Sequence, residues 1–332
     1  MIAPDFNLKR RVALLLFPVV FAGLAGNSVF AQDAGSRLTS ATPSNAAVRS
    51  NPAENGARPA VSPEPKEQGL TQEATEIARV FGLPITNSMV VTWITALGLI
   101  VFARIATRRM KHVPDGAQNV WEWLVEGLYK FLESIIGRHL VERTFWFFAS
   151  IFIFILAANW AGLIPGFGTI GWGRQTAQGF RIDEPLFRGA NADLNLTLAM
   201  ALVFFACWLI WANQELGPLG CLKELFGPKG ESTGLMRVVM GVMFFLVGCL
   251  NIISILFRPV SLSFRLYGNI FAGENMLDTM AEIVPGLGWL LPIPFYFMEL
   301  LVGFVQAMVF MLLTAVFVLL ACPQEEKTPA AG

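Results

Sequence analysis

Long apolar stretches fill most of the chain after residue 87 and predict helices that cross a membrane. The first three cover 88–108, 144–163 and 194–214, each close to the ~20 residues that span a hydrocarbon layer. The apolar region that follows fits a helical hairpin with arms at 236–284 and 288–321. We therefore expect an all-α membrane protein with about five transmembrane helices, the last two forming a long hairpin.

The segment 120–136 has a different pattern. Its apolar residues recur at helical spacing: Trp121, Leu124, Leu128, Leu132 and Ile135. Its charged residues line another face: Glu122, Glu126, Lys130 and Glu133. Four charges make a poor span, so we expect one amphipathic helix that lies at the membrane interface.

The hairpin arms are too long to stand upright in a membrane. The stretch 287–321 makes about 52 Å of helix at 1.5 Å per residue, against a hydrocarbon core of ~30 Å. Strong tilt or a kink is expected, and Pro259, Pro292 and Pro294 are positioned to break the helices.

The N-terminus has the pattern of an export signal. Three basic residues, 9–11, precede an apolar run over 12–24, and small residues surround a cleavage point after Ala31. Residues 1–31 are predicted to be a signal peptide, with an uncleaved anchor as the alternative. Residues 32–75 are polar, rich in Ala, Pro, Ser and Gly, and are predicted to be a disordered exported tail.

The distribution of Lys and Arg predicts the orientation of the remaining chain. Residues 104–143 carry seven of them, which places this segment in the cytoplasm by the positive-inside rule. Five spans then give an exported N-terminus and a cytoplasmic C-terminus. The membrane domain is expected over 76–322, with a cytoplasmic tail over 323–332.

The composition argues against several kinds of partner and site. Hydrophobic residues make up 55% of the chain, charged residues 14%, and the formal net charge is zero, so no nucleic-acid partner is indicated. The four cysteines are far apart and the two histidines have no clustered partner. We expect no disulfide framework, no metal site and no cofactor.

We single out seven residues within the apolar hairpin, six charged residues and one glutamine, because a central charge there costs at least ~2.5 kcal/mol. We assign Arg258, Asp278 and Glu282 to helix ends, from which long side chains reach water. The other four are candidates for function: Arg265, Glu274, Glu299 and Gln306.

Antiparallel pairing predicts how these four meet. The midpoint between Arg265 and Gln306, and that between Glu274 and Glu299, both fall near Pro285 in the expected turn. Two polar pairs at two depths are therefore expected, roughly 30 Å and roughly 18–20 Å of helix from the turn.

The two pairs are expected to face different surroundings. Gly268 and Ala272 share the stripe of Arg265, and such small residues allow a partner helix to approach. Glu274 lies about 180° round the helix. A packing stripe with an internal salt bridge is the alternative interpretation.

Residues 258–274 read R-P-V-S-L-S-F-R-L-Y-G-N-I-F-A-G-E. This stretch resembles the signature of the ATP synthase subunit a family, and the resemblance extends over about 76–322. Further matches are L-P-I-T-N at 83–87, V-P-D-G-A-Q-N at 113–119, Asn159 with G-L-I-P-G at 162–166, and A-D-L-N-L-T at 192–197.

The resemblance implies roles for individual residues. Arg265 matches the essential arginine that faces a rotating ring of c subunits, each with one carboxylate. Gln306 and Asn269 match its polar neighbours, and Glu274 and Glu299 match the ionisable relay of an outer half-channel. Ser261 and Asn251 are also expected in the ion pathway, and Asn251 stands where many members carry a glutamate that lines the inner half-channel.

The resemblance also implies partners and location. It places the chain in the cell inner membrane with the c ring, the b subunits of a peripheral stalk and, through them, the soluble ATPase sector. The subunit itself binds no nucleotide, and the expected ion is H⁺.

Two other function classes fit parts of the pattern. A secondary transporter would use Arg265 to bind an anionic substrate between broken helices, although the chain has no matched half-sequences. A membrane scaffold protein would have no use for the intramembrane charges.

Overall fold

The computed structural model describes residues 76–80, 83–108, 110–111, 113, 115–164, 166, 170–176, 179–226, 235–283 and 288–321. The expected signal peptide, exported tail and cytoplasmic tail lie outside these residues.

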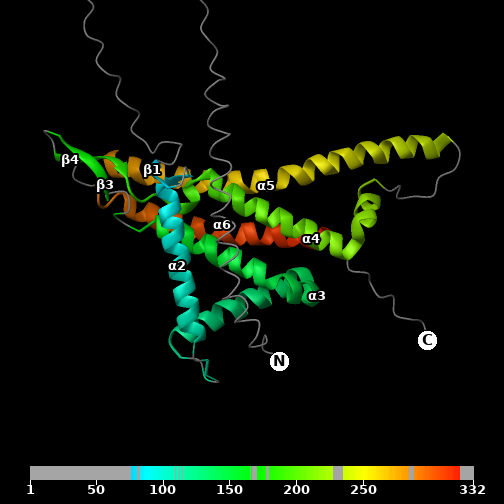
Figure 1. Cartoon of the computed structure of the whole chain (residues 1–332), viewed down its shortest axis with the longest axis horizontal. Helices are drawn as coiled ribbons and strands as arrows, with labels where there is room; N and C mark the ends of the chain where they lie inside the picture. The colour runs from blue at the N-terminus through cyan, green and yellow to red at the C-terminus, as the bar shows by residue number, and fades with distance from the viewer. Residues whose placement is uncertain are drawn as a thin grey trace, which may run out of the picture.

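Five helices in the described part of the chain are long and apolar enough to cross a membrane. They are α2 (Asn87–Thr107), α3 (Ala117–Gly162), α4 (Leu194–Phe226), α5 (Leu235–Ile283) and α6 (Pro292–Ala321). α3 packs against α2 and α6, while α4 packs against α5 (Figure 1). The predicted helical membrane fold with five spans is confirmed.

α3 consists of two arms that meet at Gly137. This glycine has φ 78° and ψ 160°, a conformation that breaks the helix and that residues with a side chain rarely adopt. The first arm buries one stripe of apolar residues: Trp121, Val125, Leu128, Leu132 and Ile136. Lys130 and Arg138 are exposed, so the amphipathic pattern predicted for this segment is present.

The loop predicted over 164–193 contains structure that the hydrophobic pattern missed. β3 (Gly171–Thr176) and β4 (Gly179–Pro185) form an antiparallel hairpin, and the short 3-10 helix η3 (Ala190–Ala192) follows. A second hairpin pairs β1 (Glu76–Val80) with β2 (Leu83–Thr86). Backbone hydrogen bonds hold such hairpins together. Because these bonds do not depend on the side chains, the hairpins leave little periodic hydrophobic signal in the sequence.

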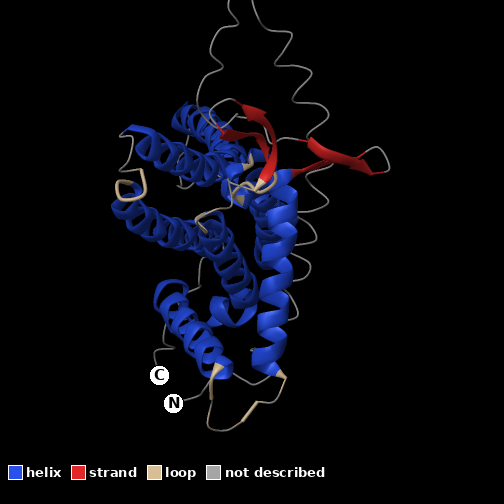
Figure 2. Ribbon diagram, turned by 90° about the vertical axis from the view of Figure 1, so that its left-hand side faces the viewer, coloured by secondary structure: helices blue, strands red, loops and turns tan. Residues whose placement is uncertain are grey.

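Figure 2 shows both hairpins at one end of the molecule, opposite the loop between α2 and α3. The segment with the predicted cytoplasmic charges and the strands therefore lie at opposite ends of α2.

The second arm of the C-terminal hairpin begins later than predicted. Residues 288–291 form a turn and α6 starts at Pro292, where proline fits because the first turn of a helix has unbonded N–H groups. α6 has 30 residues and α5 has 49, about 45 Å and 74 Å of helix. Both exceed an upright span, and Figure 1 shows them running across the direction of α2.

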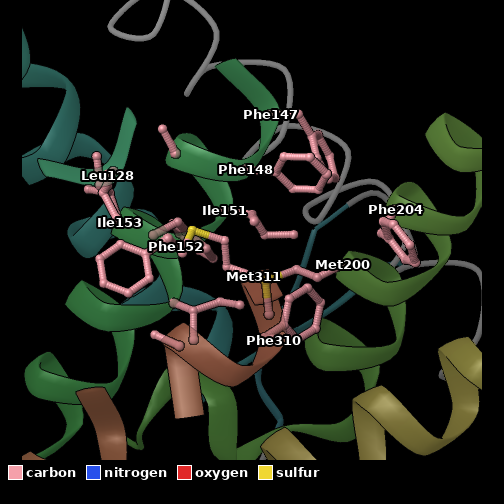
Figure 3. Packing of buried hydrophobic residues seen from close by; sticks show 14 of the residues in the cluster. Leu128, Phe147, Phe148, Ile151, Phe152, Ile153, Met200, Phe204, Phe310 and Met311 are labelled. Atoms are coloured by element: carbon pink, nitrogen blue, oxygen red, sulfur yellow. The ribbon is translucent and has the colours of Figure 1, made fainter. Parts of the chain in front are cut away.

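The apolar core lies between α3, α4 and α6. Phe147 of α3 contacts Phe204 of α4 and lies beside Phe148, while Phe310 and Met311 of α6 lie beneath them (Figure 3). All five side chains are buried.

α5 differs from the other helices because most of its apolar surface is not covered by any residue that the structure describes. Leu250, Phe257 and Phe264 are more than half exposed. Lipid or another protein is expected to cover this face.

Candidate functional site

An exposed polar stripe runs along α5. It contains Asn251, Ser261, Arg265 and Asn269, the last three one helical turn apart. A side-chain carbon added at Gly268 would meet no atom within 4 Å. The small residues predicted beside Arg265 therefore lie on a surface that the described part of the chain leaves open.

Arg265 itself reaches into this open space. Its side chain is exposed and forms no hydrogen bond or ion pair with any residue that the structure describes. A guanidinium group with five N–H donors is thus available to a group from outside the chain.

Gln306 pairs with Asn269 rather than standing level with Arg265. The Asn269 amide donates to Gln306 Oε1 over 2.8 Å, and Gln306 is only 4% exposed. The level predicted for Gln306 is therefore one turn off. Arg265 therefore lies one turn beyond the Asn269–Gln306 bridge.

Glu299 lies against the backbone of α5 at Gly273. It is 6% exposed, and a side-chain carbon at Gly273 would collide with its carboxyl group. Glycine at 273 thus allows α6 to place a carboxylate directly on the neighbouring helix.

Glu274 enters a niche between the end of α3 and the segment before η3. The N–H of Gly189 donates a hydrogen bond to its carboxylate. A side-chain carbon at Gly189 would collide with Glu274, and one at Gly162 would lie 3.0 Å from the Gly189 backbone. Two glycines therefore make the niche.

The two glutamates form one electrostatic cluster. The Glu274 carboxylate lies within electrostatic range of Glu299, Arg188 and Asp278. Glu274 Oε2 and Glu299 Oε1 are buried and accept no hydrogen bond from the residues that the structure describes. Since buried polar atoms normally have partners, these two oxygens are suited to bind protons or water.

Sequence reasoning missed a set of buried polar residues around this cluster. Asn191 donates to Asn159 over 2.6 Å, and Asn159 donates to the carbonyl of Gly303 over 2.9 Å. Ser88 Oγ donates to Asp193 over 2.6 Å. These bonds join α2, α3, α6 and the η3 segment. The one sequence signal for them is the presence of asparagine or aspartate at the ends of apolar spans.

Arg188 was also missed, because it lies between the predicted spans 144–163 and 194–214, where a charged residue is ordinary. It is 4% exposed, and its guanidinium lies 5.8 Å from the ring centre of Phe271 on α5. This places a buried cation one helical turn from Glu274.

We expected Arg258 to lie at a helix end and to reach toward water, but the structure places it elsewhere. Its guanidinium lies 4.4 Å from the ring centre of Phe317 and 5.9 Å from that of Trp208. The Trp208 indole N–H also donates to the Phe317 carbonyl over 3.0 Å. Arg258 therefore forms cation–π contacts with α4 and α6, because aromatic faces attract a guanidinium group inside apolar surroundings.

Comparison with known proteins identifies the family of the chain. The family model described as ATP synthase A chain matches residues 89–319. The chain belongs to the ATP synthase A chain family. Subunit a of Moorella thermoacetica is 32% identical over 243 residues, which cover 73% of this chain and 94% of that protein. Subunit a of Trichlorobacter lovleyi is 33% identical over 233 residues, or 70% of this chain and 85% of the relative.

Membership in the ATP synthase A chain family confirms the resemblance of residues 258–274. The chain is a multi-pass membrane subunit of an F-type ATP synthase, and its processes are ATP synthesis and proton transport. Arg265, the Asn269–Gln306 bridge and the Glu274–Glu299 cluster all lie within the matched region.

Proposed function

We propose that this subunit is the stator that passes protons through two half-channels to and from the carboxylates of a rotating c ring. The observation that carries the proposal is the separation of two environments on the α5–α6 hairpin. Arg265 is exposed on an open stripe, whereas Glu274 and Glu299 are enclosed. An open cation suits a mobile partner carboxylate, and enclosed carboxyls suit a proton relay.

In the outer half-channel, protons enter through Glu274 and Glu299 and leave toward the ring near the Asn269–Gln306 bridge. The two unpartnered oxygens give places where a proton or a water molecule can bind. Carboxyl groups act as proton donors and acceptors when a partner lies within hydrogen-bond reach, directly or through water.

Arg265 acts as the barrier between the half-channels. Arginine keeps its positive charge in proteins, so it favours the ionised form of a passing ring carboxylate and draws off its proton. The same fixed charge prevents a proton from moving directly between the two pathways.

The inner half-channel follows the same stripe of α5 in the N-terminal direction. Ser261 and Asn251 are exposed there, one and four turns of helix before Arg265. An amide binds water but exchanges no proton at neutral pH, so the inner pathway is water-filled at Asn251.

The partners and orientation follow from this role. The c ring covers the open face of α5, and b subunits connect the stator to the soluble ATPase sector, where nucleotide chemistry takes place. The subunit lies in the cell inner membrane with its N-terminus exported and its C-terminus cytoplasmic. The transported ion is H⁺.

Purification in mild detergent tests this assignment. We expect the chain to co-purify with small c subunits and with the soluble ATPase sector, because both the exposed apolar face of α5 and Arg265 require a partner. Mass spectrometry of the purified complex measures the result. A clean monomer that binds an anionic metabolite would instead support a secondary transporter.

A further inference from the structure

We propose that Arg188 is a positioning residue of the outer half-channel: its guanidinium and the adjacent Gly189 N–H hold the Glu274 carboxylate in its niche. The inference rests on the proposed function, because it concerns the same proton pathway. It assigns a second arginine to the stator, one that acts on a carboxylate of its own chain.

Arg188 is placed on α5 by an aromatic contact. Its side chain is 4% exposed and lies over the ring of Phe271, which itself stacks on Tyr267 with ring centres 5.5 Å apart. Phe271 precedes Glu274 by one turn, so the guanidinium lies on the side of α5 to which Glu274 points. The charge of Arg188 acts on the Glu274 carboxylate from there.

Gly189 completes the contact from the backbone. Its N–H donates to the Glu274 carboxylate, and the carboxylate occupies the space that a side chain at 189 would need. Arg188 and Gly189 are adjacent, so one short stretch of backbone supplies both a positive charge and a hydrogen-bond donor.

The segment that carries these two groups is held from three sides. Asn191 is bonded to Asn159 of α3, and Asp193 accepts from Ser88 of α2. Asp193 also accepts from the backbone N–H of Asn195 over 2.9 Å, at the start of α4. Since these anchors fix η3 and the residue after it, directly C-terminal to Gly189, Arg188 presents its charge at a defined position.

The position of Arg188 beside Glu274 offsets the cost of enclosing two carboxyl groups together. Two carboxyl groups, Glu274 and Glu299, are enclosed together inside the protein, where an uncompensated charge is costly and like charges repel. A fixed cation beside Glu274 allows one of the two to stay ionised and in place while the other exchanges a proton. Without Arg188, Glu274 has only a single backbone donor to hold it.

Proton flow through membrane vesicles stripped of the soluble sector tests the role. For Arg188→Gln we expect passive proton conductance to fall about tenfold, the effect of ~1.4 kcal/mol on a rate. Arg188→Lys should recover part of the flux, because it restores the charge but not the planar guanidinium. Arg138→Gln is the matched control, because Arg138 is an exposed arginine paired with Glu142 on the amphipathic arm of α3.

A double-mutant cycle separates positioning from a general structural role. If Arg188 acts through Glu274, then Arg188→Gln/Glu274→Gln conducts as well as Glu274→Gln alone. If Arg188→Gln alone does not assemble, the double variant is expected to assemble, because the carboxylate that lost its cation is absent.

Three results would overturn the inference. They are normal conductance in Arg188→Gln, losses that simply multiply in the double variant, and a double variant that fails to assemble. The proposed function is tested by a different variant: it is rejected if Arg265→Ala retains proton-driven ATP synthesis. Normal flux in Arg188→Gln together with lost synthesis in Arg265→Ala therefore rejects Arg188 alone.

Discussion

Arg265→Ala is expected to abolish proton-driven ATP synthesis in membrane vesicles while the subunit still assembles. The side chain is exposed and has no partner among the described residues, so its removal leaves no buried orphan and no cavity. What disappears is the charge that meets the ring carboxylate. Losing ~3 kcal/mol at that step slows it by about 100-fold or more. Luciferase detection of ATP after an imposed proton gradient measures the effect.

Two variants serve as controls for that result. Arg265→Lys is expected to retain only part of the activity, because a lysine can lose its proton when it is desolvated and cannot bind a carboxylate with two parallel bonds. Arg138→Ala removes an exposed arginine from the amphipathic arm of α3 and should leave synthesis unchanged. Near-normal synthesis in Arg265→Ala would refute the proposed mechanism.

Replacing both Glu274 and Glu299 by glutamine is expected to give the second largest effect. An amide keeps the shape and hydrogen-bonding capacity of the carboxyl group but exchanges no proton at neutral pH. Proton conductance through stripped vesicles should fall about tenfold or more, since a change of ~1.4 kcal/mol in a rate-limiting transfer already gives a factor of ten.

Each single replacement is expected to lower conductance less than the double one, because water bound at the remaining carboxyl can still pass a proton. Glu142→Gln is a suitable control, since Glu142 is an exposed carboxylate of α3 that pairs with Arg138 and lies outside the niche. Unchanged flux in the Glu274/Glu299 double variant would remove both residues from the relay.

The sequence was informative wherever chemistry and periodicity were local. The spans at 88–108 and 194–214 follow from apolar length alone, and the structure places α2 and the apolar window of α4 within one residue of them. The motif around Arg265 was visible because an arginine within an apolar helix is rare. Both features depend on neighbouring residues in the chain.

Features that depend on distant contacts could not be read from the sequence. Gly273 looks like any small residue until α6 places Glu299 on it, and Arg188 looks like a loop charge until it packs on Phe271. Arg258 was misjudged for the same reason, since Phe317 lies on another helix. The level of Gln306 was one turn off because it depends on how α5 and α6 pack, where Gln306 bonds to Asn269.

Disulfide cross-linking tests most directly whether the Arg265 stripe of α5 meets the c ring. The natural cysteines are first replaced by serine, and Ala272→Cys is combined with a cysteine one turn from the carboxylate of the c subunit. Leu97→Cys, on an exposed face of α2, is the control. We predict a product between this subunit and c from position 272 and none from position 97. A product from position 97, with none from position 272, would contradict the account.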